Sequence, residues 1–134
     1  MPTTRQLTDP ALAAVAAADE WARQAEVAKL LATLDWATTH EATGPATEPG
    51  TPGLQLGGPG CPWISEYDTW DLACTLGLSA GSVTHYLGNA LELRYRLPLL
   101  WQRVLDLEVP LWRAVRIAER TQCLPLEGAA QVDH

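Results

Sequence analysis

The sequence has no phenylalanine, so leucine, tryptophan and tyrosine must supply the large side chains of any core. Basic residues are scarce as well: nine Lys and Arg stand against 16 Asp and Glu, for a formal net charge of -7. This charge argues against the whole chain being a nonspecific binder of nucleic acid or of acidic membranes. No apolar run approaches the roughly 20 residues of a membrane-spanning helix, and no apolar signal-peptide region follows the N-terminus. We therefore expect no membrane partner.

Cysteine is also rare. Cys61, Cys74 and Cys123 form no CxxC pair, and an odd number of cysteines cannot all pair within one chain. A disulfide framework is therefore a poor explanation of these three residues. We expect reduced thiols in a cytoplasmic protein.

The residues that are present predict an all-α domain organised around a helix-turn-helix pattern at residues 65–93. Ser65 is placed to cap the first helix, and Asp68 stands three residues later, at the N3 position of a capping box. Gly77 marks the left-handed end of that helix, and Leu78 takes the hydrophobic position of a Schellman motif. Ser79 then caps the second helix. The apolar residues of this second helix recur at helical spacing: Val83, Leu87, Ala90 and Leu91.

A long helix precedes this pair. Asp9-Pro10 is a strong helix start, and the alanine-rich sequence favours helix as far as about His40. Residues 16–26 offer little large apolar surface, so this half of the helix is either covered by another helix or subunit, or frayed. We therefore name self-association or a helical partner as candidate interactions of this helix. Trp21 points away from its apolar face, which comprises Leu12, Val15, Val27, Leu30, Leu31 and Leu34.

Between these parts, residues 43–62 hold six of the ten glycines and five of the ten prolines. No helical or strand period is visible there, and the Gly57-Gly58-Pro59-Gly60 run lacks the Lys of a phosphate-binding loop. We predict a linker. The expected organisation is therefore a long helix over 1–42, a Gly/Pro-rich loop over 43–62 and a helix-turn-helix-like helical domain over 63–134.

Three short helices are expected after the pair, each introduced by a proline at Pro98, Pro110 or Pro125. The chain stops about two turns into the last of them, which suggests a truncated form of a longer protein. In the middle one, Leu111, Val115 and Ala118 are expected to face inward. Three arginines lie opposite them at i, i+3 and i+7: Arg113, Arg116 and Arg120.

This arginine face is the candidate nucleic-acid contact, with Arg94 and Arg96 as further candidates, because guanidinium groups suit phosphate. An ordinary solvated face, or pairing with the acidic residues of the long helix, explains the same arginines. DNA would then be bound weakly and without sequence preference. Four tryptophans are candidates either for base stacking or for the core: Trp63, Trp70, Trp101 and Trp112.

The second helix of the pair is a weaker candidate for reading DNA. Opposite its apolar stripe lie Gly81, His85, Gly88 and Glu92, without Lys or Arg, and a Glu repels phosphate. Two glycines on an exposed helix face are costly, so we predict that Gly81 and Gly88 pack against another helix. His85 and Asn89 are one turn apart, and a solvated polar face explains them better than a metal site.

Several phrases of the sequence resemble a known family. LDWATTHEATG, LACTLGLSAGSVTHYLGNALELRYRLPLLWQRV, EVPLWRAVRIAERT and LPLEGAAQVD are similar, in this order, to the actinobacterial domain of unknown function 222 of the 13E12 repeat proteins. The resemblance covers about residue 34 to the C-terminus. It implies an all-helical domain that precedes an HNH endonuclease domain, and it supplies no catalytic residue to this chain.

The HNH region itself is missing, and His40, His85 and His134 are too dispersed to form its metal site. We therefore expect no enzyme activity, metal or cofactor. The function expected is that of a non-catalytic accessory domain of an HNH-endonuclease-associated protein. The alternative is a helix-turn-helix DNA-binding regulator, and HNH nuclease activity would need a downstream domain.

Overall fold

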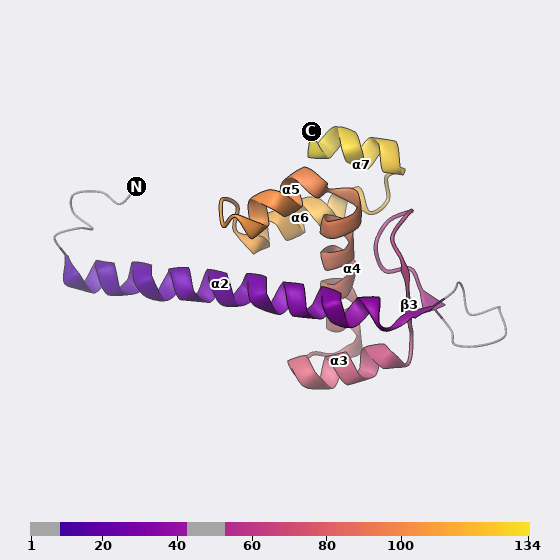
Figure 1. Ribbon diagram of the computed structural model, residues 1–134, viewed down its shortest axis with the longest axis horizontal. Helices are drawn as coiled ribbons and strands as arrows, with labels where there is room; N and C mark the ends of the chain where they lie inside the picture. Colours follow the sequence, from indigo (N-terminus) through magenta and orange to yellow (C-terminus); the bar gives the residue numbers. More distant parts are fainter. Residues whose placement is uncertain (1–8, 43–52) are drawn as a thin grey trace.

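The computed structural model describes residues 9–42 and 53–134 (Figure 1). These residues form six helices and one small three-stranded sheet, which confirms the predicted mostly helical fold. No helix in these two ranges has the length and apolar character needed to cross a membrane. The elements, in chain order, are α2 (Pro10–Thr38), β1 (Glu41–Ala42), β2 (Gly53–Leu54), β3 (Trp63–Ser65), α3 (Asp68–Leu76), α4 (Ala80–Arg96), α5 (Pro98–Leu105), α6 (Leu111–Thr121) and α7 (Leu126–Asp133).

Helix α2 begins where the sequence predicts. The Asp9 side chain accepts hydrogen bonds from the backbone N–H groups of Ala11 and Leu12, at 2.9 and 3.3 Å. Only the C-terminal part of α2 is buried, and its first half extends beyond the other helices (Figure 1). Apart from the half-buried Arg23, every residue from 10 to 26 is exposed. Trp21 is 77% exposed, as its position opposite the apolar face predicts.

The turn between α3 and α4 is also as predicted. Gly77 has a φ of 67°, and its N–H donates to the Cys74 carbonyl while the Leu78 N–H donates to the Ala73 carbonyl. This is the pair of bonds of a Schellman motif. At the start of α4, the Ser79 side chain accepts a hydrogen bond from the Ser82 N–H at 3.1 Å.

The predicted start of α3 is wrong. Ser65 does not cap this helix, because its backbone belongs to β3, where its N–H donates to the His40 carbonyl at 2.9 Å. Helix α3 begins at Asp68, after Tyr67, which makes no side-chain cap. Pairing between residues far apart in the chain therefore outweighs the local capping pattern.

The sheet was not predicted, and it changes the interpretation of the Gly/Pro-rich segment. Its strand order is β1-β3-β2 with antiparallel pairs, and the central residue Ile64 is fully buried between Glu41 and Leu54. Cys61, just before β3, is buried as well. Residues 53–62 are thus packed against the helical body rather than forming an open linker. Residues 43–52 of the predicted loop lie outside the described residues.

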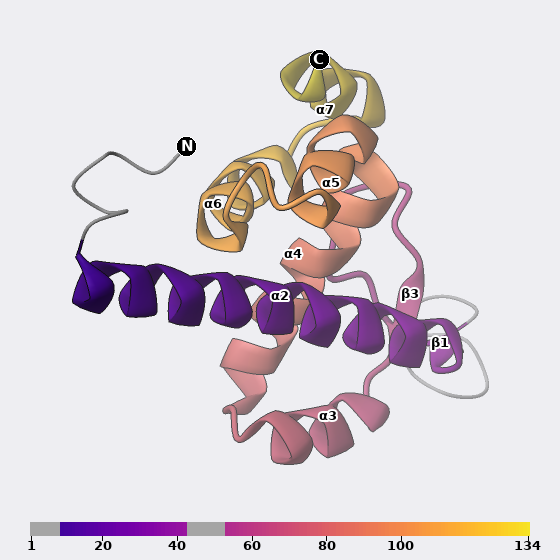
Figure 2. The same cartoon turned by 60° about the vertical axis from the view of Figure 1, so that its left-hand side comes forward.

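Helix α4 is the centre of the fold. It contacts α2, α3, α5, α6 and α7, and it passes behind α2 in Figure 2. Val83, Leu87, Ala90 and Leu91 are at most 1% exposed, as predicted. Every residue from 87 to 93 is buried, so this part of α4 is enclosed on all sides.

Candidate nucleic-acid interface

The arginine face predicted on α6 is exposed. Ala114 and Ala118 are fully buried on one side of this helix, which turns the opposite side outward. Within the described part of the chain, the arginines of this face form no ion pair, so the proposed pairing with the acids of α2 is not observed there. The arginine face comprises Arg113, Arg116 and Arg120.

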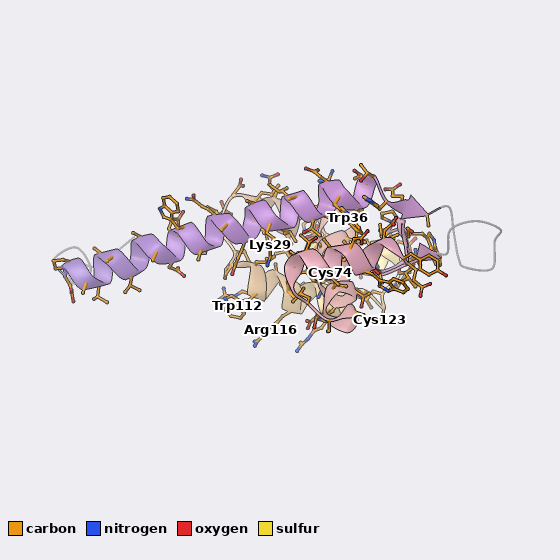
Figure 3. All side chains as sticks on the ribbon, turned by 90° about the horizontal axis from the view of Figure 1, so that it is seen from below. Lys29, Trp36, Cys74, Trp112, Arg116 and Cys123 are labelled. Carbon is orange, nitrogen blue, oxygen red and sulfur yellow. The ribbon has the colours of Figure 1, made fainter. Side chains whose placement is uncertain are left out.

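An exposed tryptophan joins this face at the start of α6. The Trp112 side chain is 56% exposed, and its ring centroid lies 5.3 Å from the Arg113 guanidinium carbon and 5.2 Å from that of Arg116. Both distances lie within the range of cation–π attraction. Figure 3 shows Trp112 and Arg116 next to each other on one side of the molecule. The spacing of Trp112 and Arg116, one helical turn apart, is visible in the sequence.

Two hollows of about 400 Å³ each flank Trp112. The first lies between α2 and the start of α6, and the carboxylates of Asp19, Glu26 and Glu108 line it together with Arg23. The second is lined by two basic residues, Lys29 and Arg116, and by two acidic ones, Glu26 and Glu119. The first hollow carries an excess of negative charge and repels phosphate, whereas the charges of the second balance.

The two further arginine candidates differ in their surroundings. Arg94 is exposed in the last turn of α4, with its guanidinium 5.8 Å from the Tyr95 ring. Arg96 is only 1% exposed, so the prediction that it contacts nucleic acid is wrong. Its guanidinium pairs with the buried carboxylate of Glu92 at 3.1 Å. The i, i+4 spacing of Glu92 and Arg96 is the sequence feature that indicates such a pair.

Glu92 and Arg96 form the centre of a buried polar cluster. One Glu92 oxygen accepts from the Gly58 backbone N–H at 2.9 Å, and the other accepts from the Thr121 hydroxyl at 2.7 Å. Arg96 also donates to the backbone carbonyls of Gln122, at 3.3 Å, and of Leu124. The cluster joins α4 to the Gly58 segment and to the end of α6.

The expectation of a solvated polar face on α4 is wrong at Asn89. Asn89 is 1% exposed, and its side-chain oxygen accepts a hydrogen bond from the Gln122 amide at 2.8 Å. His85 is exposed, as expected, and its Nε2 lies 2.8 Å from a carboxylate oxygen of Glu119. The solvated polar face was inferred for His85 and Asn89 alone, and the structure confirms it for His85.

The two glycines singled out on α4 have different environments. Gly88 is buried, and a Cβ added to it would lie 2.5 Å from the Leu56 carbonyl oxygen. The predicted close approach is therefore present at Gly88, although the neighbour is an extended segment and not a helix. Gly81 is exposed and has no neighbour within 4 Å of an added Cβ, so the packing prediction is wrong there.

The cysteines and histidines form no second site in the described ranges. Cys74 and Cys123 are exposed, and none of the three cysteines is paired. Burial, followed by the nearby Glu92 carboxylate, raises the pKa of the Cys61 thiol to about 12, so this residue stays protonated at neutral pH. His40 stacks on Trp36, with ring centroids 4.4 Å apart. No group of three His, Cys, Asp or Glu side chains with metal-binding geometry occurs in residues 9–42 and 53–134.

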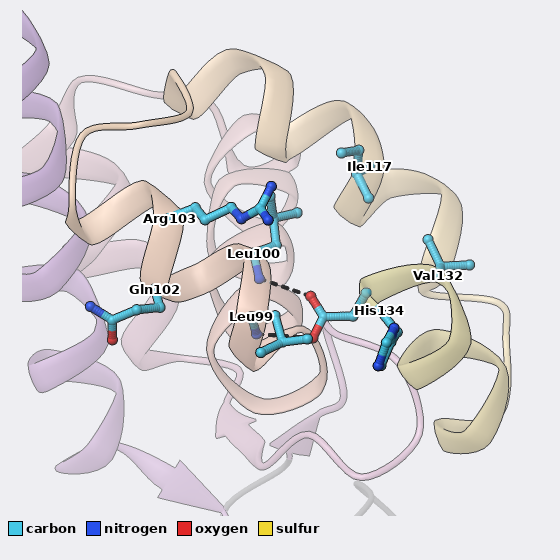
Figure 4. Close-up of a pocket in the computed structure, with 8 residues that line it drawn as sticks. Leu99, Leu100, Gln102, Arg103, Ile117, Val132 and His134 are labelled. Carbon is cyan, nitrogen blue, oxygen red and sulfur yellow. Dashed lines mark hydrogen bonds between the residues drawn. The ribbon is translucent and has the colours of Figure 1, made fainter.

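A pocket of about 490 Å³ lies between α5, α6 and α7 (Figure 4). At its edge the carboxylate of Asp133, from α7, accepts hydrogen bonds from the backbone N–H groups of Leu99 and Leu100, at 2.9 and 2.8 Å. These groups belong to the first turn of α5, whose N-cap residue Leu97 has no side-chain hydrogen bond to offer. Asp133 therefore acts as the missing cap and attaches α7 to α5, a structural role.

No protein-family model, no curated protein and no solved structure matches this chain.

Proposed function

We propose that this chain is a non-catalytic accessory domain that contacts nucleic acid through the arginine face of α6. The observation that carries the proposal is the exposure of Arg113, Arg116 and Arg120 on one side of α6, without ion pairs in the described residues. The resemblance to the helical domain that precedes HNH endonucleases supports the accessory role.

The binding expected from this face is electrostatic. Each guanidinium that contacts a phosphate releases counterions from the polynucleotide, which makes the affinity strongly dependent on salt. The net charge of -7 opposes binding, and so do the carboxylates in the two hollows beside Trp112. Contacts to phosphate alone also carry no sequence information. The interaction is therefore weak and nonspecific.

The first prediction tests the arginine face. Replacing Arg113, Arg116 and Arg120 together with Gln abolishes binding to two unrelated duplexes, or lowers the slope of log K against log salt by about 3. Fluorescence anisotropy over a salt series measures both quantities. The control, Arg23→Gln with Arg103→Gln, removes positive charge from α2 and α5 outside the arginine face and keeps most of the binding. An equal loss in the control and the triple variant contradicts a localised interface.

The helix-turn-helix regulator has less support. Because residues 87–93 of α4 are buried, only the first turns of this helix are available to a DNA groove, and they carry no Lys or Arg. Sequence-selective binding that is lost in His85→Ala would favour the regulator over the arginine face. HNH nuclease activity remains tied to a downstream domain, as the resemblance implies.

The exposed half of α2 supports a second interaction, self-association or the binding of a helical partner. Leu12 and Val15 are 40% and 64% exposed, on the same side of α2 as the buried Leu30 and Leu34. Since residues 10–18 carry no charge, a second helix packs there without desolvating an ion.

The second prediction follows from this apolar stripe. The chain forms dimers in light-scattering measurements at high concentration, and Leu12→Glu with Val15→Glu makes it monomeric. Trp21→Glu, on the opposite side of the same helix, leaves the mass unchanged. A monomeric parent chain contradicts self-association and leaves a different helix as the partner.

A further inference from the structure

Trp112 is distinguished from the other exposed tryptophans by its neighbours. Trp70 is equally exposed, at 56%, but its ring packs edge-on against Tyr67 at 5.3 Å. Trp21 is more exposed and lies on the projecting half of α2. Among the described tryptophans, cation–π contacts occur at Trp112 alone, and both of its partners belong to the arginine face.

The arrangement along α6 places an aromatic plane beside a row of cations. Arg113 and Arg116 lie against the indole, and Arg120 is eight residues after Trp112, which corresponds to about 12 Å along the helix axis. The hollow between α2 and the start of α6 is lined by three carboxylates, from Asp19, Glu26 and Glu108, and by Arg23. The row of cations therefore continues from Trp112 along α6 to Arg120, and a polyanion in contact with Trp112 follows that row.

From this geometry we infer that Trp112 is a stacking platform for an unpaired base and that the arginine face prefers single-stranded nucleic acid. The inference rests on the proposed function and names its substrate class. A base that stacks on the indole displaces a guanidinium from the ring, and that guanidinium then contacts the neighbouring phosphate. Bases of a duplex are stacked within the double helix, so they cannot use the platform without unpairing.

The stacking platform predicts a preference for single-stranded nucleic acid and no preference for a base sequence. Every base has a π face, so stacking on one tryptophan discriminates little among bases. Stacking and phosphate contacts do not involve the ribose 2′-hydroxyl, so we expect single-stranded DNA and RNA both to bind. Oligo(dT), oligo(U) and a mixed-sequence duplex of equal length are the three probes that test this.

The third prediction concerns Trp112→Leu, measured by anisotropy with these probes. We expect its affinity for oligo(dT) and oligo(U) to fall by about 5- to 150-fold, as for the loss of one stacked base, and its affinity for the duplex to change less than twofold. Trp112→Tyr retains an aromatic plane and keeps most of the single-strand affinity. Trp70→Leu is the control for removal of an equally exposed indole, and it leaves all three affinities unchanged.

The results separate this inference from the proposed function. One outcome overturns the stacking inference and leaves the arginine interface standing. In it the parent chain binds duplex and single strands alike, Trp112→Leu has no effect, and the triple arginine variant loses binding. If the parent chain binds none of the three probes, both are overturned. If oligo(U) binds and oligo(dT) does not, the chain discriminates between the two sugars, and the inference that stacking alone selects single strands of both polymers is overturned. Circular dichroism of each variant confirms that its fold is retained.

Discussion

Glu92→Gln is expected to lower the free energy of unfolding by about 3–5 kcal/mol, the range found when one member of a buried ion pair is removed. Both side chains of the Glu92–Arg96 pair are 0% exposed. The variant leaves the Arg96 guanidinium buried without its counter-charge, since a neutral amide cannot compensate it. The hydrogen bonds of Glu92 to Gly58 and Thr121 also weaken, because an amide offers only one acceptor oxygen.

Urea denaturation, followed by circular dichroism, measures this loss as a decrease in the midpoint at constant slope. The matched control is Glu119→Gln, which removes a carboxylate that lies 2.8 Å from His85 Nε2. The side chains of His85 and Glu119 are 61% and 41% exposed, so solvent weakens their interaction and the expected loss is below about 1 kcal/mol. Equal losses in the two variants would contradict the structural role of the buried pair.

A double variant separates the charge from the shape of the cluster. Glu92→Leu with Arg96→Met removes both charges, so neither is left buried and unpaired. The double variant is therefore expected to lose less free energy of unfolding than the sum of the losses of Glu92→Leu alone and Arg96→Met alone. It does not return to the parent stability, because the Gly58 N–H and the carbonyls of Gln122 and Leu124 lose their partners.

The parts of the fold that follow from sequence are those encoded by neighbouring residues. Asp9-Pro10 and Ser79 start helices, and Gly77 ends one, because each acts on backbone groups within a few positions of itself. The exposed side of α6 was predicted for a similar reason: the apolar period of an amphipathic helix determines which side faces outward. Local chemistry was sufficient for these elements.

The errors concern residues whose partners are distant in the chain. Ser65 was assigned to a helix cap, but His40 and Gly53 pair with its backbone, and no local pattern indicates those strands. Arg96 was assigned to the surface because its neighbours were unknown, and the groups that bury it come from the Gly58 segment and from residues 121–124. A charged residue is assigned to the surface by default, and this buried cluster is an exception.

The glycines of α4 offer the sharpest test of the packing. Gly88→Ala is expected to destabilise the protein by about 1–3 kcal/mol, the usual cost of overpacking a closely packed site. The added Cβ would lie 2.5 Å from the Leu56 carbonyl oxygen, so the backbone of residues 55–57 has to move. The same movement disturbs the neighbouring Gly58 N–H, whose hydrogen bond to Glu92 is 2.9 Å long.

Gly81→Ala, on the same helix, is expected to have the opposite sign. No atom of the described residues lies within 4 Å of its added Cβ, and alanine in an exposed helix position is favoured over glycine by about 1 kcal/mol. Thermal or urea unfolding of the two variants therefore shifts the midpoint in opposite directions. A stabilised Gly88→Ala would mean that the Leu56 segment does not pack against α4. A destabilised Gly81→Ala would mean that a further segment or a second copy covers the start of α4, a position that residues 9–42 and 53–134 leave open.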